Sequence, residues 1–193
     1  MGARGERGTG MTNGQGSKKQ IIFLGVLIGV IVLVVAGYLV QNRPARKKII
    51  ASGDRAPEFR LTASDGKHVN LSDFRGKVVM VHFWATWCPP CIEEMPALDK
   101  LNNALKGTDF VMLAVSVDEG GVEAVAPFML SNRLNLPVLF DPGGEVARLY
   151  GTFKFPETYI VDREGVVRFK VIGSRDWAEP ANIQSMRELV GAR

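Results

Sequence analysis

Cysteine and histidine are both rare in this sequence, with two of each in 193 residues. A disulfide-rich scaffold needs more cysteines, and a metal site built by the protein needs more Cys and His ligands at suitable spacing. Excess positive charge is also missing from residues 51–193, which hold 16 of the 24 Lys and Arg but 19 of the 20 Asp and Glu. A mildly acidic domain argues against a nucleic-acid-binding surface. We therefore expect no metal and no nucleic-acid partner.

Charged residues are absent from residues 21–40. Such a helix is about 30 Å long, which matches the hydrocarbon core of a bilayer. A cleaved signal peptide is the alternative, but its apolar region has about 7–15 residues and ends at a small-residue cleavage site. The present run is longer than such an apolar region. It is followed by Gln41-Asn42-Arg43-Pro44, which does not resemble a small-residue cleavage site. It therefore predicts an uncleaved transmembrane anchor, preceded by a flexible Gly-rich tail at residues 1–20.

The orientation of this anchor is not decided by charge. Four Lys or Arg residues precede the span, and four more follow it within residues 41–50. The positive-inside rule therefore gives a tie.

After a linker at residues 41–53, apolar runs alternate with helical patterns. Nearly continuous apolar runs at 78–84 and 110–117 are typical of central strands covered on both faces. A helical pattern at 91–106 separates them, which predicts a right-handed parallel βαβ unit.

Further elements complete an α/β domain over residues 54–193. Strands are expected at 58–61, 67–70, 137–140, 158–161 and 166–172, and helices near 121–134, 144–150 and 180–191. The first two of these strands should form one hairpin and the last two another. The sequence thus predicts a mixed central sheet with helices on both faces.

Both cysteines, Cys88 and Cys91, lie where the first central strand ends and the long helix begins. A helix N-terminus presents free N–H groups and a partial positive charge, which stabilise a thiolate. Two intervening residues allow a reversible disulfide. We expect Cys88 to be the exposed nucleophile and Cys91 to be the buried resolving thiol.

Other uses of a cysteine pair fit less well. Half a zinc site needs a second pair of ligands, and neither His68 nor His82 has the spacing. Covalent haem attachment needs a histidine after the second cysteine, where Ile92 stands. A purely structural disulfide remains an alternative, although it would not need a helix N-terminus.

The segment FWATWCPPC at residues 83–91 resembles the active-site segment of the thioredoxin superfamily. It is most similar to that of the membrane-anchored TlpA/ResA/CcmG-type thiol-disulfide oxidoreductases. Residues 56–59 with 71–77 resemble the leading hairpin of that family, and residues 155–162 resemble its cis-proline segment.

The resemblance covers residues 54–193 and implies a thioredoxin-like fold. It implies an N-terminal β-hairpin and a central helical insertion at 121–134. It also implies a cis Phe155–Pro156 bond packed against the disulfide, which would expose the Phe155 backbone to an extended substrate peptide.

Glu94 shares one helical face with Cys91 and Leu98. A desolvated carboxyl has a raised pKa and can exchange a proton with Cys91. A surface or capping role for Glu94 is the alternative. The resemblance favours the first role, since ResA-type proteins carry an active-site glutamate at this spacing.

Several neighbours of the pair are candidate substrate-binding residues: Trp87, Pro89, Pro90, Phe155, Pro156 and Glu157. Pro89 and Pro90 lack N–H groups that could stabilise the Cys88 thiolate, which predicts a low reduction potential and hence a reductant. Trp87 is expected to rim the groove. Glu157 either touches substrate or is a solvated loop acid.

The resemblance implies an enzyme with no cofactor besides its own Cys88–Cys91 disulfide. It would reduce protein disulfides on the extracytoplasmic face, apocytochrome c among them. The N-terminus would be cytoplasmic, with a single pass through the inner membrane. Electrons would come from a membrane thiol shuttle of the CcdA/DsbD kind. The alternatives are a disulfide-inserting oxidant, a non-catalytic binding or holdase domain, and a peroxidase, whose single-cysteine threonine motif is missing here.

Overall fold

A computed structural model describes residues 15–41 and 49–192 of the chain. Most of the predicted tail and linker lies outside these residues. The chain divides into two compact units, Met1–Arg46 and Lys47–Arg193.

The first unit contains one helix, α1 (Gln15–Gln41). Its segment Ile21–Gln41 has a mean hydropathy of 2.9 and is long and apolar enough to cross a membrane. Within the described residues it is the one helix that meets this condition. The helix begins earlier than the apolar run at 21–40 because Lys18 and Lys19 also fit a helical backbone.

The second unit is built on a seven-stranded sheet with strand order β2-β1-β5-β4-β3-β6-β7. The strands are β1 (Arg60–Ala63), β2 (His68–Asn70), β3 (Val78–Trp84), β4 (Phe110–Ser116), β5 (Val138–Phe140), β6 (Glu157–Val161) and β7 (Val167–Ile172). β3, β4 and β5 are parallel, while the other neighbouring pairs are antiparallel. The mixed sheet and both hairpins are therefore confirmed.

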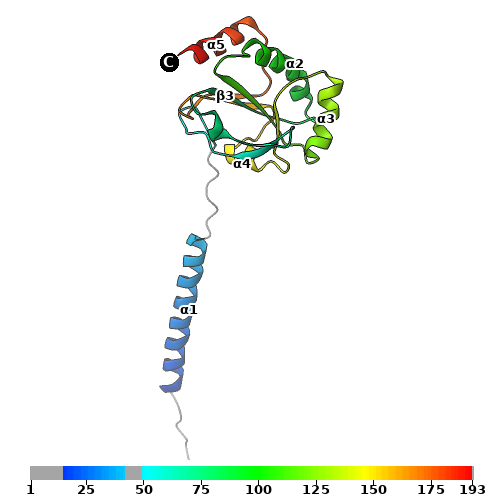
Figure 1. The fold of residues 1–193 in the computed structure, drawn as a ribbon. Coiled ribbons are helices and arrows are strands. Elements are labelled where there is room, and N and C mark those ends of the chain that lie inside the picture. Colours follow the sequence, from blue (N-terminus) through cyan, green and yellow to red (C-terminus); the bar gives the residue numbers. More distant parts are fainter. Residues whose placement is uncertain (1–14, 42–48, 193) are drawn as a thin grey trace, which may run out of the picture. The chain divides into compact units, whose positions relative to one another are not determined.

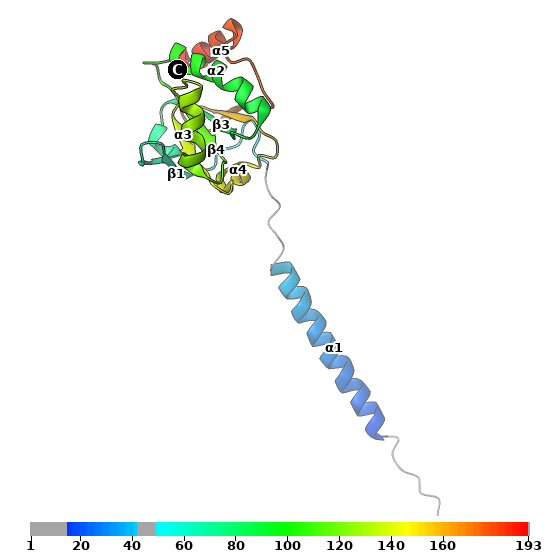
Figure 2. The ribbon, with the colours of Figure 1, turned by 90° about the vertical axis from the view of Figure 1, so that its right-hand side faces the viewer.

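Helices cover both faces of this sheet. They are η1 (Leu71–Phe74), a 3-10 turn, and α2 (Pro89–Ala104), α3 (Gly121–Ser131), α4 (Glu145–Tyr150) and α5 (Pro180–Gly191). α2 and α5 lie on one side of the sheet and α4 on the other (Figures 1 and 2). α3 stands between β4 and β5 in the chain, where the helical insertion was predicted.

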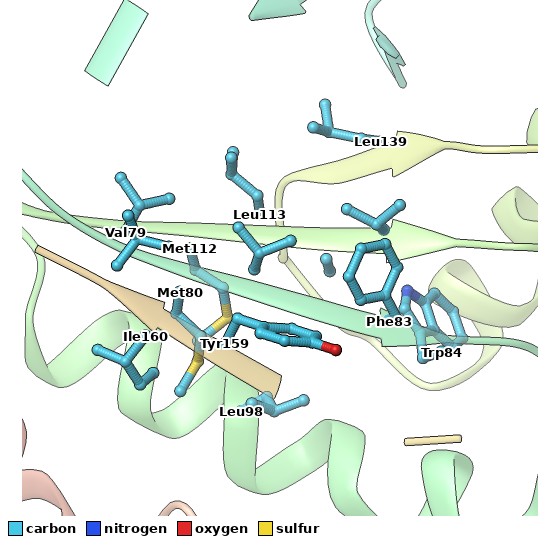
Figure 3. Packing of buried hydrophobic residues seen from close by; sticks show 14 of the residues in the cluster. Val79, Met80, Phe83, Trp84, Leu98, Met112, Leu113, Leu139, Tyr159 and Ile160 are labelled. Carbon is cyan, nitrogen blue, oxygen red and sulfur yellow. The ribbon is translucent and has the colours of Figure 1, made fainter. Parts of the chain in front are cut away.

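Buried side chains pack on both faces of the sheet, which explains why helices cover both faces. All seven residues of β3 are buried, as expected for a strand covered on both faces. Met80 and Ile160 pair across β3 and β6 on the side that faces Leu98 of α2 (Figure 3). On the opposite side, the ring of Tyr150 from α4 lies 5.3 Å from that of Phe83.

Candidate active site

The two cysteines form a disulfide where β3 passes into α2. Cys88 occupies the N-cap position in an extended conformation, and Cys91 lies in the first helical turn. Their Cα atoms are 5.3 Å apart. The expectation of an exposed Cys88 is wrong for this oxidised form. Cys88 is 5% exposed and Cys91 is completely buried, because both side chains belong to the hydrophobic core.

The start of α2 has few backbone donors near the disulfide. Pro89 and Pro90 are the first two helical residues and have no N–H groups. The next two amides, of Cys91 and Ile92, both donate to the Cys88 carbonyl, at 3.0 and 3.1 Å. Within the described part of the chain, no backbone amide caps the Cys88 side chain.

The loop before Cys88 is held by Asp118, which sequence reasoning missed. Asp118 is buried and accepts hydrogen bonds from the Thr86 backbone amide and hydroxyl, at 3.0 and 2.6 Å. The Ser116 hydroxyl also donates to it at 2.7 Å. The sequence signal that could have indicated Asp118 was an acidic residue directly after the predicted strand at 110–117.

Glu94 is a buried carboxyl on the inner face of α2, as its spacing predicted. It is 4% exposed, and burial raises its pKa to about 7. The Trp177 indole N–H donates to Oε1 and partly offsets this rise, as does the Arg175 backbone. Oε2 has no hydrogen-bond partner among the described residues.

Trp177 was also missed by sequence reasoning. It is 3% exposed, in the loop between β7 and α5. The signal for it was a single tryptophan within the otherwise polar stretch SRDWAE at 174–179.

The Phe155–Pro156 peptide bond is cis, as the resemblance implied. Phe155 precedes the buried Pro156, and its ring meets that of Trp87 edge-on, with centroids 6.0 Å apart. Trp87 is 61% exposed and directly precedes Cys88. The fold therefore brings the cysteine segment and the cis-proline segment side by side.

Glu157 does not occupy the place predicted for it. It is completely buried at the start of β6, so it neither faces a substrate nor lies in a solvated loop. Its Oε1 lies 2.6 Å from both Lys170 Nζ and the Tyr159 hydroxyl. The Phe153 amide donates to Oε2 at 3.3 Å. Strand alternation places Glu157 and Tyr159 on the same inner face of β6.

His82 lies in the middle of β3 and is also completely buried. Its Nδ1 is 2.9 Å from the Thr158 hydroxyl on β6. Burial lowers its pKa to about 3, so the ring is neutral. This placement agrees with a structural role. Within the described residues, no group of three or more His, Cys, Asp or Glu could hold a metal ion.

Comparisons with known proteins agree with this geometry. The AhpC/TSA family matches residues 52–170. The chain is 35% identical to the thiol-disulfide oxidoreductase ResA of Bacillus subtilis (strain 168) over 158 residues, which cover 81% of this chain and 88% of ResA. The chain belongs to the ResA-like thiol-disulfide oxidoreductases. It is therefore an enzyme of thiol-disulfide exchange.

Two solved structures resemble this oxidoreductase. One is a Chlorobium tepidum protein described as a thiol:disulfide interchange protein DsbE, with 33% identity and a TM-score of 0.63 over 73% of this chain and 96% of that chain. The other is the exposed lipoprotein thioredoxin (Etrx1) of Streptococcus pneumoniae strain TIGR4, with 32% identity and a TM-score of 0.57 over 69% and 100%. Both share the thioredoxin-like fold predicted from the sequence.

Proposed function

We propose that this oxidoreductase reduces protein disulfides on the extracytoplasmic face of the inner membrane, with apocytochrome c as a substrate. The observation that carries the direction of the reaction is the pair Pro89-Pro90 at the start of α2. A strong oxidant stabilises its nucleophilic thiolate, often through helix N-terminal amides. These prolines have no amide hydrogen to donate, and the next two amides bind the Cys88 carbonyl instead. A less stabilised thiolate favours a reductant.

The mechanism assigns one role to each cysteine. The Cys88 thiolate attacks one sulfur of the substrate disulfide, forms a mixed disulfide and releases the other substrate sulfur as a thiolate. Cys91 then loses its proton to Glu94 and attacks the Cys88 sulfur, which frees the second substrate thiolate. The protein dithiol is thereby oxidised to the disulfide, and the substrate disulfide is reduced.

Substrate docking falls to the surface beside the disulfide. The backbone amide and carbonyl of Phe155 have no hydrogen-bond partner among the described residues. In our proposal they pair with an extended substrate segment, while the exposed Trp87 ring and the exposed Pro89 and Pro90 border this docking surface. Pro156 fixes the course of this segment. Glu157 is left out of the docking surface because it is buried.

The proposed location rests on α1 and on the relatives. α1 is apolar enough to anchor the domain, and one relative of this fold is an exposed lipoprotein. An extracytoplasmic reductant needs electrons from across the bilayer, because its surroundings are oxidising. We therefore propose a membrane thiol shuttle of the CcdA/DsbD kind as donor, with the N-terminus of the chain in the cytoplasm.

The reduction potential of the full chain tests the direction. The protein in detergent micelles is equilibrated with dithiol buffers, and alkylation reports the reduced fraction of its only two cysteines. We expect about −250 mV or lower, close to thioredoxin. A value near about −120 mV matches strong oxidants and would reverse the assignment.

Substrate and orientation are tested in cells. Cys91→Ser leaves the mixed disulfide unresolved, so it should trap substrates that the matched Cys88→Ser variant does not trap. Apocytochrome c should be among them, and its absence would remove it from the proposal. Reduced Cys88 should react with a membrane-impermeant maleimide added outside. Protection from this reagent would place the domain in the cytoplasm. Full function of a Cys88→Ser/Cys91→Ser protein would favour the binding or holdase alternative.

A further inference from the structure

The contact between Trp177 and Glu94 joins two distant parts of the chain at the reactive dithiol. Trp177 lies in the loop after β7, 83 residues beyond Glu94, and its indole N–H donates to Glu94 Oε1. Glu94 lies one turn after Cys91 on the same face of α2. We propose that Trp177 is a positioning residue that holds the Glu94 carboxyl and determines which of its oxygens carries the proton exchanged with Cys91. This inference rests on the proton role of Glu94 proposed above.

The chemistry of the indole makes this contact directional. An indole N–H can only donate a hydrogen bond, so Oε1 must be an acceptor in both protonation states of Glu94. Oε2 is buried and has no partner among the described residues, so in this proposal it is the oxygen that carries the proton. Trp177 thus leaves one oxygen available for the transfer.

The loop that carries Trp177 is itself well anchored. The buried Asn182 side chain of α5 donates to the Asp176 carbonyl at 2.6 Å. The Ala178 amide donates to Asp176 Oδ1 at 3.0 Å. The Arg175 guanidinium lies 5.4 Å from the centre of the Trp177 ring. These contacts hold the loop and flank the indole ring, which supports the position of the N–H against Glu94.

A pocket of about 400 Å³ beside Glu94 offers the proton a way to solvent. It is lined by α2 and by the 174–178 loop, and not by the cysteine or cis-proline segments. Its charged groups are Glu93 and Lys100 from α2 and Arg175 and Asp176 from the loop. From the sheet, the neutral His82 lies on the face that α2 covers. The proton can therefore leave while a substrate occupies the docking surface beside the disulfide.

In the reductive direction, the Cys91 S–H bond breaks and its proton moves to Glu94 Oε2. The Cys91 thiolate then forms a bond to Cys88 Sγ and displaces the substrate thiolate, and the Glu94 proton passes to water in the pocket. Loss of the indole N–H raises the pKa of Glu94, because a hydrogen bond to the carboxylate stabilises its charged form. At a pH near or below that pKa, a smaller fraction of the carboxyl is then ionised and able to accept the Cys91 proton.

Ellman's reagent separates the two chemical steps. The full chain in detergent micelles, reduced with a phosphine, is mixed with one equivalent of the reagent in a stopped-flow instrument. The first thionitrobenzoate released reports attack by Cys88, and the second reports resolution by Cys91. Because the chain has no other cysteine, both phases come from this pair. The rate of the second phase is measured across pH.

In the wild type we expect an inflection of the second phase near pH 7, where burial places the pKa of Glu94. Trp177→Phe keeps an aromatic ring but removes the N–H. Its inflection should move upward by about one to two pH units, which corresponds to one hydrogen bond to a charged group. With a shift of one unit, the second phase slows about fivefold at pH 7. The first phase should not change.

Trp84→Phe is the matched control. Trp84 is also completely buried, but its indole N–H has no acceptor within the described residues. This variant should keep the wild-type inflection, and an equal shift would mean that loss of any buried indole has the same effect, which overturns the proposal. If Trp177→Phe does not fold, benzothienylalanine at position 177 replaces the N–H with sulfur and preserves the shape of the ring.

Glu94→Gln separates the two proposals. It should abolish the inflection near pH 7, and adding Trp177→Phe to it should cause no further shift. A normal inflection in Glu94→Gln would refute the proton role of Glu94 itself. An altered inflection in Glu94→Gln together with an unshifted one in Trp177→Phe would refute only the role of Trp177.

Discussion

The buried ion pair between Glu157 and Lys170 offers a quantitative test of the fold around the cis-proline. Lys170→Met removes the cation that lies 2.6 Å from a completely buried carboxylate. Among the described residues, the Tyr159 hydroxyl and the Phe153 amide then remain to donate to Glu157. Removing one partner of a buried pair costs about 3–5 kcal/mol, so we expect about 3 kcal/mol of lost unfolding free energy.

Replacing the other member of the pair, Glu157, should lower the free energy of unfolding by less. Glu157→Gln keeps an oxygen that accepts from Tyr159, and the flexible Lys170 stem can turn its ammonium group towards water. We expect a loss of about 1–2 kcal/mol. Combining both substitutions leaves no buried charge, so the double variant should be more stable than Lys170→Met alone.

Urea titration followed by tryptophan fluorescence measures these differences in the full chain. All three tryptophans lie in the second unit, so α1 does not contribute to the signal. Lys67→Met is the control, since Lys67 pairs with Asp65 at the surface and its side chain is 81% exposed. That control should show no measurable change. A loss below about 1 kcal/mol in Lys170→Met, or an equal loss in Glu157→Gln, would refute the reasoning.

Three further predictions concern the site. Pro90→Ala restores the second helical amide, which can donate to the Cys88 thiolate, and should raise the reduction potential by about 20–60 mV in glutathione equilibration; an unchanged potential would contradict the proline argument. The pKa of Glu94 rises from 4.5 to about 7 on folding, so wild-type stability should fall by up to about 3 kcal/mol between pH 4.5 and 7. Glu94→Gln should remove this decline in urea titrations at each pH, and a persisting slope would assign it to other groups. Trp87→Ala should lower kcat/KM for insulin reduction about threefold or more through lost aromatic contact, while the rate with Ellman's reagent stays constant; equal losses would mean that Trp87 acts on the sulfur chemistry.

The sequence predicted the central elements of the fold accurately because their signals are local. β3 occupies the predicted residues 78–84, where a continuous apolar run is buried on both faces. The βαβ unit followed from periodicity alone. The prediction was less accurate for the first hairpin, whose first strand was expected at 58–61 and lies at 60–63. Its register depends on pairing with β5, a partner distant in sequence.

In the active site, too, features that depend on neighbouring residues were predictable, and features that depend on distant ones were not. The placement of Cys88 and Cys91 at the start of a helix was predictable, since strand, cysteines and helix are contiguous. The inward direction of Glu94 followed from helical spacing. The cis-proline was implied only by family resemblance, because the residues themselves allow an ordinary turn.

By itself, the sequence determined an apolar helix long enough to span a membrane, an α/β domain and a dithiol at a helix N-terminus. Each depends on residues within one element or two adjoining ones. Only the tertiary structure decided that Glu157 is buried against Lys170 and that Trp177 binds Glu94. These contacts join separate elements of the chain. A polar side chain can be buried only where a partner forms a hydrogen bond or ion pair with it. Such a partner can be distant in sequence, and local sequence patterns do not identify it.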